Sequence, residues 1–129
     1  MAADAPKVKG GVLSYQELLV WQKGMDLCEA CYKFTARLPR DETYGLASQI
    51  RRAAVSVPSN IAEGFGRDQQ GSFVQYLRIS QGSLKELETQ VLICRRVGLM
   101  TEDDTRTVLP IADEVGRMIR SLIRSQQTG

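Results

Sequence analysis

The sequence predicts an all-α protein, an antiparallel up-down-up-down four-helix bundle. Four long segments carry apolar side chains at steps of three and four residues, and no segment shows the strict alternation of a convincing strand. Short turns containing proline or glycine separate these segments. Helices of roughly 22 to 26 residues joined by such turns pack antiparallel to their neighbours. The 129 residues are therefore expected to form one bundle domain over residues 14–129, after a flexible N-terminal tail at residues 1–13.

The first helix is expected from about Ser14 to Leu38, and Pro39 ends it. Ser14 and Glu17 have the spacing of a capping box. The apolar side chains form two stripes that together cover about half of the helix circumference. That is wider than a helix needs for packing on one side only.

The second helix is expected from about Thr43 to Phe65, with Gly64 and Gly66 at its end. Beside its apolar face runs a polar stripe with steps of three and four residues. The stripe consists of Ser48, Arg52, Ser56, Ser59, Glu63 and Arg67, with Asn60 at its border. Pro58 is expected to kink this helix, because it has no N–H to donate to the carbonyl of Ala54.

Two interpretations of this polar stripe remain open. In the first, the helix is merely bent and the stripe faces water. In the second, the stripe is buried against another subunit or a ligand, because solvated faces usually carry many lysines and glutamates rather than serines. Arg52, Asn60, Glu63 and Arg67 would then form a polar network that the bend at Pro58 positions.

The third helix is expected from about Ser72 to Val97, with Gly98 as its C-terminal glycine. A heptad core stripe runs along it and includes one serine, Ser80. Beside it lies a second stripe, which consists of Tyr76, Ile79, Ser83, Glu86, Gln90, Ile93 and Val97. Apolar ends around a polar middle suit a subunit interface better than water. Together with the wide apolar surface of the first helix, this stripe predicts a homo-oligomer.

The fourth helix is expected to begin at Thr101, a suitable N-cap. Acidic residues occupy its first turn, and arginines lie toward its other end. This is the charge order that the helix dipole favours.

The composition argues against an enzyme. The chain has no histidine, which removes the commonest general base and metal ligand. It also has no phosphate-binding glycine loop. Cys28 and Cys31 form a CxxC inside an apolar helix, and with Cys94 alone they fall short of a zinc site. Glu63 and Glu86 are more plausible in structural salt bridges than as a catalytic carboxylate pair. No catalytic residue, metal or cofactor is therefore expected.

The expected location is cytoplasmic, with no membrane partner. No apolar run approaches the roughly 18 residues that a membrane span needs, and the N-terminus does not resemble a signal peptide. The three cysteines, an odd number, do not indicate a disulfide framework.

Three segments carry a resemblance to a known family: YQELLVWQKGMDL, YGLASQIRRAAVSVPSNIAEGFGR and FVQYLRISQGSLKELETQ. They resemble the 23S ribosomal RNA intervening-sequence proteins, also called four-helix bundle proteins, and the similarity covers about Leu13 to Ser125. The resemblance implies a left-handed bundle that assembles into a homopentameric ring. The family is named for a genetic location, an open reading frame inside inserted ribosomal RNA segments, and not for an activity.

The segment VLPIADEVGRMIRSLIR is also similar to the last helix of the accessory variability protein of diversity-generating retroelements. That relative forms a basic pentamer that engages nucleic acid and a reverse transcriptase, whereas this chain has a net charge of only +2.

The expected function is therefore a non-enzymatic, oligomeric scaffold that binds an unidentified protein. The alternative is an accessory protein that contacts the phosphate backbone of RNA or DNA through a basic rim of the oligomer. The basic residues available for such a rim are Arg51, Arg52, Arg67, Arg78, Lys85, Arg95 and Arg96.

Overall fold

The computed structural model describes residues 14–67 and 69–127, so the predicted N-terminal tail at residues 1–13 lies outside the described residues. The described chain is all-helical and contains no strand. Its four long helices are α1 (Leu19–Thr35), α2 (Leu46–Phe65), α3 (Gln70–Arg96) and α5 (Leu109–Gln127). Three short pieces complete it: the 3-10 turns η2 (Tyr15–Glu17) and η3 (Arg40–Glu42), and the single turn α4 (Glu102–Thr105). The predicted all-α fold with four long helices is confirmed.

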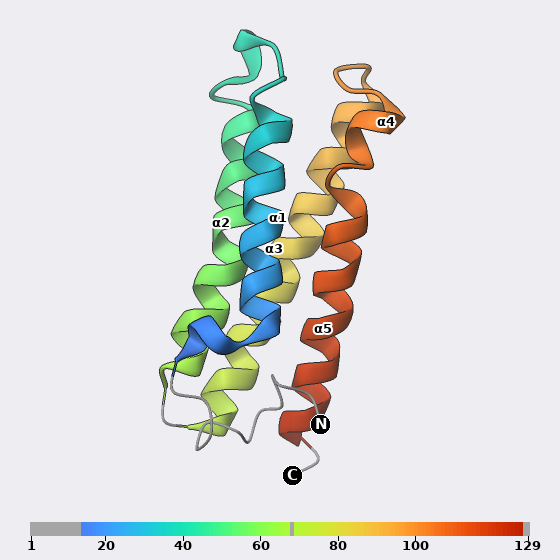
Figure 1. Ribbon diagram of the computed structural model, residues 1–129. Helices are drawn as coiled ribbons and strands as arrows, with labels where there is room; N and C mark the ends of the chain where they lie inside the picture. The colour runs from blue at the N-terminus through green and yellow to red at the C-terminus, as the bar shows by residue number, and fades with distance from the viewer. Residues whose placement is uncertain (1–13, 68, 128–129) are drawn as a thin grey trace.

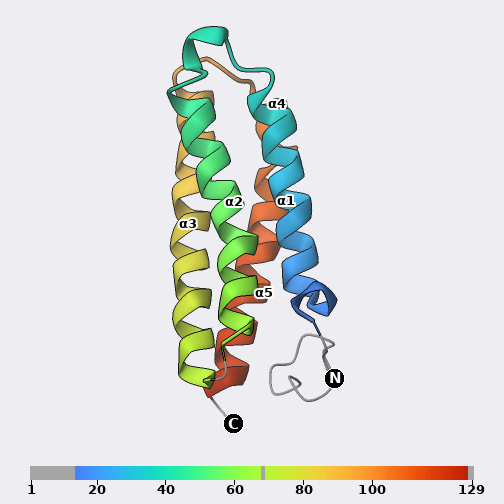
Figure 2. The same ribbon diagram turned by 90° about the vertical axis from the view of Figure 1, so that its left-hand side faces the viewer.

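The long helices lie side by side along a common direction (Figures 1 and 2). α1 and α2 are joined near η3 at one end of the bundle, and α2 and α3 are joined at the other end (Figure 1). α3 and α5 are joined through α4, at the same end as η3 (Figure 1). Within the described chain, no helix combines the length and the apolar character that crossing a membrane requires.

The first helix starts later than the capping-box spacing predicts. Ser14 caps η2 rather than α1, and its hydroxyl accepts a hydrogen bond from the backbone N–H of Gln16 at 3.1 Å. Leu18 then takes an extended conformation, with φ −75° and ψ 126°, and its fully buried side chain joins the core. The predicted helix from Ser14 is therefore divided, because Leu18 gains burial by leaving the helical path.

The fourth helix is also divided. Thr101 is an N-cap, as predicted, and forms a capping box with Asp104, but α4 ends after one turn. Pro110 follows in the first turn of α5, where a proline is tolerated because its missing N–H would have no helical partner there. A single helix through this region would place Pro110 in an interior position, where it would cost about 3 kcal/mol.

The core runs along the centre of the bundle, and α3 supplies its most regular row. All seven residues of the predicted heptad stripe are buried: Phe73, Leu77, Ser80, Leu84, Leu87, Val91 and Cys94. α5 contributes a matching row of buried aliphatic residues that includes Val115 and Ile119. The helical period thus identified the core face of α3 correctly, the serine included.

Two glycines have structural roles that differ from each other. Gly98 has a positive φ of 83° just after α3, as expected of a C-terminal glycine. Gly66 is the C-cap of α2, at the predicted end of the helix, and Gly64 is a buried residue of its last turn. A Cβ atom at this position would lie 2.5 Å from the Cβ of Tyr76 on α3. Gly64 is therefore the point where α2 and α3 approach too closely for any side chain.

Candidate functional site

The most unusual feature of the bundle is a row of polar contacts between α2 and α3, called the α2–α3 seam from here on. Each side of the seam contributes five side chains. They are Gln49, Ser56, Asn60 and Glu63 on α2 with Arg67 just after its end, and Tyr76, Ser80, Ser83, Glu86 and Gln90 on α3. Small residues line the seam at its middle, so the two backbones approach closely and short hydroxyl groups reach across.

The middle of the seam is a hydroxyl and amide cluster. The hydroxyl oxygens of Ser56 and Ser83 lie 2.8 Å apart. The side-chain amide of Asn60 donates to the hydroxyl of Ser56 at 2.9 Å and to the carbonyl of Ser56 at 2.8 Å. One step further into the core, the buried hydroxyl of Ser80 donates to the carbonyl of Val57 at 2.8 Å. These bonds satisfy polar groups that would otherwise be costly to remove from water.

One end of the seam carries a charged cluster beside Gly64. Arg67 donates to Glu63 at 3.2 Å and to the hydroxyl of Tyr76 at 2.8 Å, and this hydroxyl donates to Glu63 at 3.1 Å. The guanidinium carbon of Arg67 also lies 5.1 Å from the centre of the Tyr76 ring. About half of the Glu63 and Arg67 side chains is exposed, so this ion pair contributes little to the stability of a single chain.

The other end of the seam is centred on Gln90, which is buried. Its amide nitrogen donates to the side chains of Gln49 and Glu86, at 3.3 Å each. Its amide oxygen is buried and has no hydrogen-bond partner among the described residues.

The structure does not bring the whole predicted polar stripe of α2 into one network. Arg52 and Ser59 are exposed, Ser48 is half-buried, and their side chains make no hydrogen bond or ion pair within residues 14–67 and 69–127. Arg52 is therefore not linked to Asn60 or Glu63, which corrects the predicted four-residue network.

Pro58 is buried within α2, and the helix continues through it to Phe65. Its ring packs against α1 at Gly24, where an added Cβ would be 3.5 Å from the Cβ of Pro58. Polar groups from α2 and α3 lie near Pro58. Asn60 bonds to Ser56, and the hydroxyl that enters this region belongs to Ser80 on α3.

The second stripe of α3 is also divided in the single chain. Tyr76, Ser83 and Gln90 face α2 and take part in the seam. Glu86 is exposed and accepts the bond from Gln90 on its own helix, whereas the apolar members are exposed without joining the seam: Ile79 by 44%, Ile93 by 41% and Val97 by 61%. Within the single chain the stripe therefore divides: its α2-facing members find partners in their own chain, and its role as a subunit interface stays a prediction.

An apolar groove of about 370 Å³ lies between α1 and α2. Its walls include Trp21, Met25 and Cys28 from the first helix and Val55 and Ala62 from the second. Trp21 is held edge-on against Tyr15, with ring centres 5.2 Å apart. Met25 and Val55 remain exposed by 45% and 42%, so the groove presents apolar surface on the outside of the bundle.

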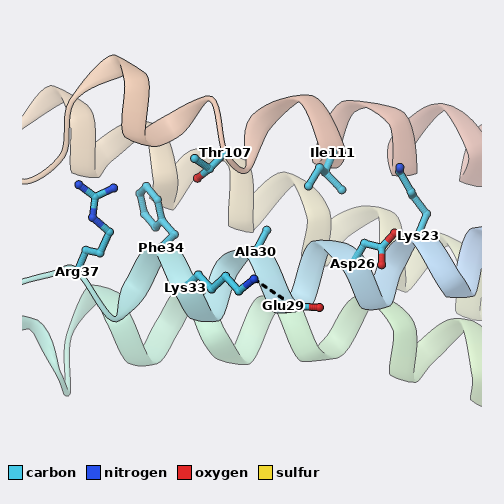
Figure 3. A pocket seen from close by; sticks show the side chains of 9 residues that line it. All are labelled: Lys23, Asp26, Glu29, Ala30, Lys33, Phe34, Arg37, Thr107 and Ile111. Atoms are coloured by element: carbon cyan, nitrogen blue, oxygen red, sulfur yellow. Dashed lines mark ion pairs between the residues drawn. The ribbon is translucent and has the colours of Figure 1, made fainter.

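A more polar groove of about 480 Å³ lies between α1 and α5 (Figure 3). Phe34, Ala30 and Ile111 supply its apolar part, and side chains of both charges surround them. These charges are largely paired: Lys33 with Glu29 at 3.0 Å, Lys23 with Glu114 at 3.3 Å, and Arg37 with Asp104 at 2.5 Å. The pair of Lys23 and Glu114 joins α1 to α5. Because most of the charges are paired, the groove carries little net charge.

The three cysteines are free thiols, and two of them, Cys31 and Cys94, are buried. Burial, together with the neighbouring Cys28, raises the pKa of Cys31 to about 12. Burial also raises the pKa of Cys28 and of Cys94. These thiols therefore stay protonated at neutral pH, which makes them poor nucleophiles and metal ligands. Among the described residues, no group of three or more His, Cys, Asp or Glu side chains is placed to hold a metal ion.

Comparison with known proteins gives one family match and one structural neighbour of note. The model of the family described as 23S rRNA-intervening sequence protein matches residues 16–121. A crystal structure of a protein of unknown function from the S23 ribosomal protein family of Bacteroides thetaiotaomicron superposes with a TM-score of 0.74 at 20% sequence identity. The superposition covers 82% of this chain and 99% of that one, which shows a shared fold. A search of curated proteins gives no match.

Proposed function

We propose, on the premise that this chain belongs to the 23S rRNA-intervening sequence protein family, that it is a non-enzymatic, homo-oligomeric scaffold. In this proposal the four helices form an antiparallel bundle, and the bundles assemble into a ring, most simply a pentamer. The ring then presents repeated copies of one surface to a protein partner.

The observation that carries this proposal is apolar surface left exposed on two sides of the polar stripe of α2. On one side lies a ridge formed by Ile79 and Ile93 on α3 and by Val97, the C-cap of this helix. On the other side lies the apolar groove between α1 and α2, with Met25 and Val55 at its opening. Soluble monomers rarely expose large contiguous apolar patches, so such surface commonly marks an interface.

The different shapes of these two surfaces favour a ring over a two-fold dimer. A ridge from one copy can be seated in a groove of the next copy, so each subunit contributes a different surface to the contact. Such head-to-tail contacts generate a closed ring when the rotation between subunits is suitable. A two-fold dimer would instead require the ridge and the groove of each subunit to lie within one shared, self-complementary patch.

The absence of catalysis in this proposal is supported by composition and by the state of the thiols. The sequence contains no histidine, and the cysteines are protonated at neutral pH because burial raises their pKa. The charged side chains around the α1–α5 groove are largely paired with one another.

The test is native mass measured by light scattering for matched charge variants of α3. Ile79→Glu combined with Ile93→Glu should reduce the mass to that of a single chain while the helical circular dichroism signal is kept. Leu92→Glu is the matched control, because Leu92 is exposed by 39% on the same helix but lies outside the ridge. Loss of assembly in the control, or an intact assembly in the double variant, would contradict the proposed interface.

A second candidate function, contact with the phosphate backbone of RNA or DNA, is favoured by a particular set of side chains. Exposed arginines on α3 and α5 make no ion pair within residues 14–67 and 69–127: Arg78, Arg95, Arg96, Arg120 and Arg124. Repetition of these cations around a ring would concentrate positive charge that the net charge of one chain conceals. Lys85 is less available, because it pairs with Glu88 at 3.0 Å.

Salt-dependent binding to a short single-stranded RNA tests this second function. Arg95→Ala combined with Arg96→Ala should weaken binding, and the loss should shrink as salt is raised, because fewer counterions are released. Arg117→Ala is the control, since Arg117 is exposed but paired with Asp113 at 3.1 Å. Absence of RNA binding by the parent protein at low salt would exclude this function.

A further inference from the structure

A third cavity, of about 380 Å³, lies where the end of α1 meets the start of α2 beside η3, away from the α2–α3 seam. α1 and α2 are joined at this end of the bundle (Figure 1). Its polar lining consists of two arginines, Arg40 and Arg51, and two threonines, Thr35 and Thr43. No carboxylate lines it, in contrast to the α1–α5 groove.

Arg51 is held in a fixed position on one wall of this cavity. Its Nε donates to the hydroxyl of Thr35 at 2.7 Å, and this hydroxyl in turn donates to the carbonyl of Cys31 at 2.9 Å. Its guanidinium carbon lies 4.7 Å from the centre of the Tyr32 ring. The side chain is thus fixed by a hydrogen bond and by a cation–π contact, and neither contact neutralises its charge.

The two terminal nitrogens of Arg51 make no ion pair with a carboxylate in the described part of the chain, and neither does Arg40. The two acidic residues nearest in sequence, Asp41 and Glu42, are not part of the lining, and Oε1 of Glu42 accepts a hydrogen bond from the backbone N–H of Leu46. The carbonyls of Phe34 and Thr35, in the last turn of α1, already accept backbone hydrogen bonds. The lining therefore combines two cations with the hydroxyl of Thr43 and contains no carboxylate.

We propose that this cavity binds a phosphate group, with Arg51 as the bidentate ligand and Arg40 as a second cation. A guanidinium whose Nε is already fixed presents two parallel N–H groups, and this arrangement matches two phosphate oxygens. The hydroxyl of Thr43 supplies a further donor on the cavity wall. The inference goes beyond the proposed scaffold function and does not depend on oligomer formation.

The test compares two neighbouring arginines in the intact protein. The probes are inorganic phosphate and a short single-stranded RNA, each titrated at constant ionic strength with chloride as the reference anion. Arg51→Gln should weaken binding of the phosphate-bearing probe by about tenfold, the typical effect of losing a charge-assisted pair. Arg52→Gln, one residue further along α2 but outside the cavity, should leave the binding of inorganic phosphate unchanged.

Arg40→Gln is a second variant that separates loss of phosphate binding from loss of folding. The Arg40 side chain makes no hydrogen bond or ion pair in the described chain, whereas Arg51 contributes to local packing. Arg40→Gln should therefore keep the parent melting temperature and still weaken phosphate binding.

Each outcome decides the matter. Binding of inorganic phosphate that depends on Arg51 supports the site and indicates a small phosphate-bearing ligand. Binding of RNA alone that Arg51→Gln weakens more than Arg52→Gln does supports the site and identifies backbone phosphate as the ligand. Equal losses for Arg51→Gln and Arg52→Gln, or no difference from chloride for either probe, would overturn the proposal. Because the readout is anion affinity rather than native mass, its failure is distinguishable from failure of the scaffold proposal.

Discussion

Replacement of Gly64 by alanine should destabilise the bundle, although the same change in an open helical position is stabilising. The added Cβ would lie 2.5 Å from the Cβ of Tyr76 and 3.2 Å from Cδ1 of Phe73. Carbon atoms prefer separations of about 3.5 to 4.0 Å, so α2 and α3 must move apart by roughly 1 Å. Tyr76 cannot rotate away, because its Cβ is bonded directly to the backbone of α3.

The expected magnitude follows from two opposing effects. Overpacking of a close contact costs about 1–3 kcal/mol, whereas replacing glycine by alanine in a helix returns up to about 1 kcal/mol. The net free energy of unfolding should therefore fall by about 1–2 kcal/mol, or roughly 3 to 8 °C in melting temperature for a domain of this size. The separation of the helices should also lengthen the contacts of the nearby Glu63, Arg67 and Tyr76 cluster.

The assay is urea unfolding followed by circular dichroism, with all variants at one protein concentration because assembly couples stability to concentration. Gly82→Ala is the matched control, since Gly82 is exposed on α3 and a Cβ there meets nothing within 4 Å. It should gain about 0.5–1 kcal/mol. If Gly64→Ala proved as stable as the parent or more so, the close approach of α2 and α3 at this point would be refuted.

Three further outcomes are expected. Ser80→Ala should lower the free energy of unfolding by about 1 kcal/mol, measured by chemical denaturation, because its buried hydroxyl donates to a carbonyl of α2. Asp104→Asn should lower the melting temperature at neutral pH but not in acid. Hydrogen bonds from Thr101, and then the charge of Arg37, hold the pKa of the Asp104 carboxyl below its ordinary 3.8. The ionised carboxyl therefore stabilises the folded state fully above pH 3.8, and this stabilisation is lost as the pH falls through the folded-state pKa. Protein purified without added metal should contain no stoichiometric zinc by mass spectrometry, since burial keeps the three thiols protonated; one zinc per chain would contradict this.

The sequence predicted the helices and the core face of α3 because both depend on the local helical period. It placed the starts of two helices wrongly, at Ser14 and at Thr101. A capping motif shows where a helical turn begins, but it does not show how many turns follow. At these sites the burial of Leu18 and the position of Pro110 decide the length.

The candidate site was predicted only in parts, because it depends on how two helices are aligned. The stripes on α2 and α3 were both visible in the sequence, but their mutual contact was missed. The signal was available: the paired residues Ser56 and Ser83 are equally distant from the turn between the helices, and so are Gln49 and Gln90. The cavity around Arg51 was missed for a similar reason, since Thr35 lies on another helix.

The native mass of the parent chain tests the central claim, assembly through the α3 ridge and the α1–α2 groove, most directly. Light scattering of dilute protein should give a multiple of the 14.4 kDa chain mass, and a pentamer would give five times that value. The same measurement on Ile79→Glu combined with Ile93→Glu should give 14.4 kDa. A parent protein that is monomeric at micromolar concentration would contradict the claim.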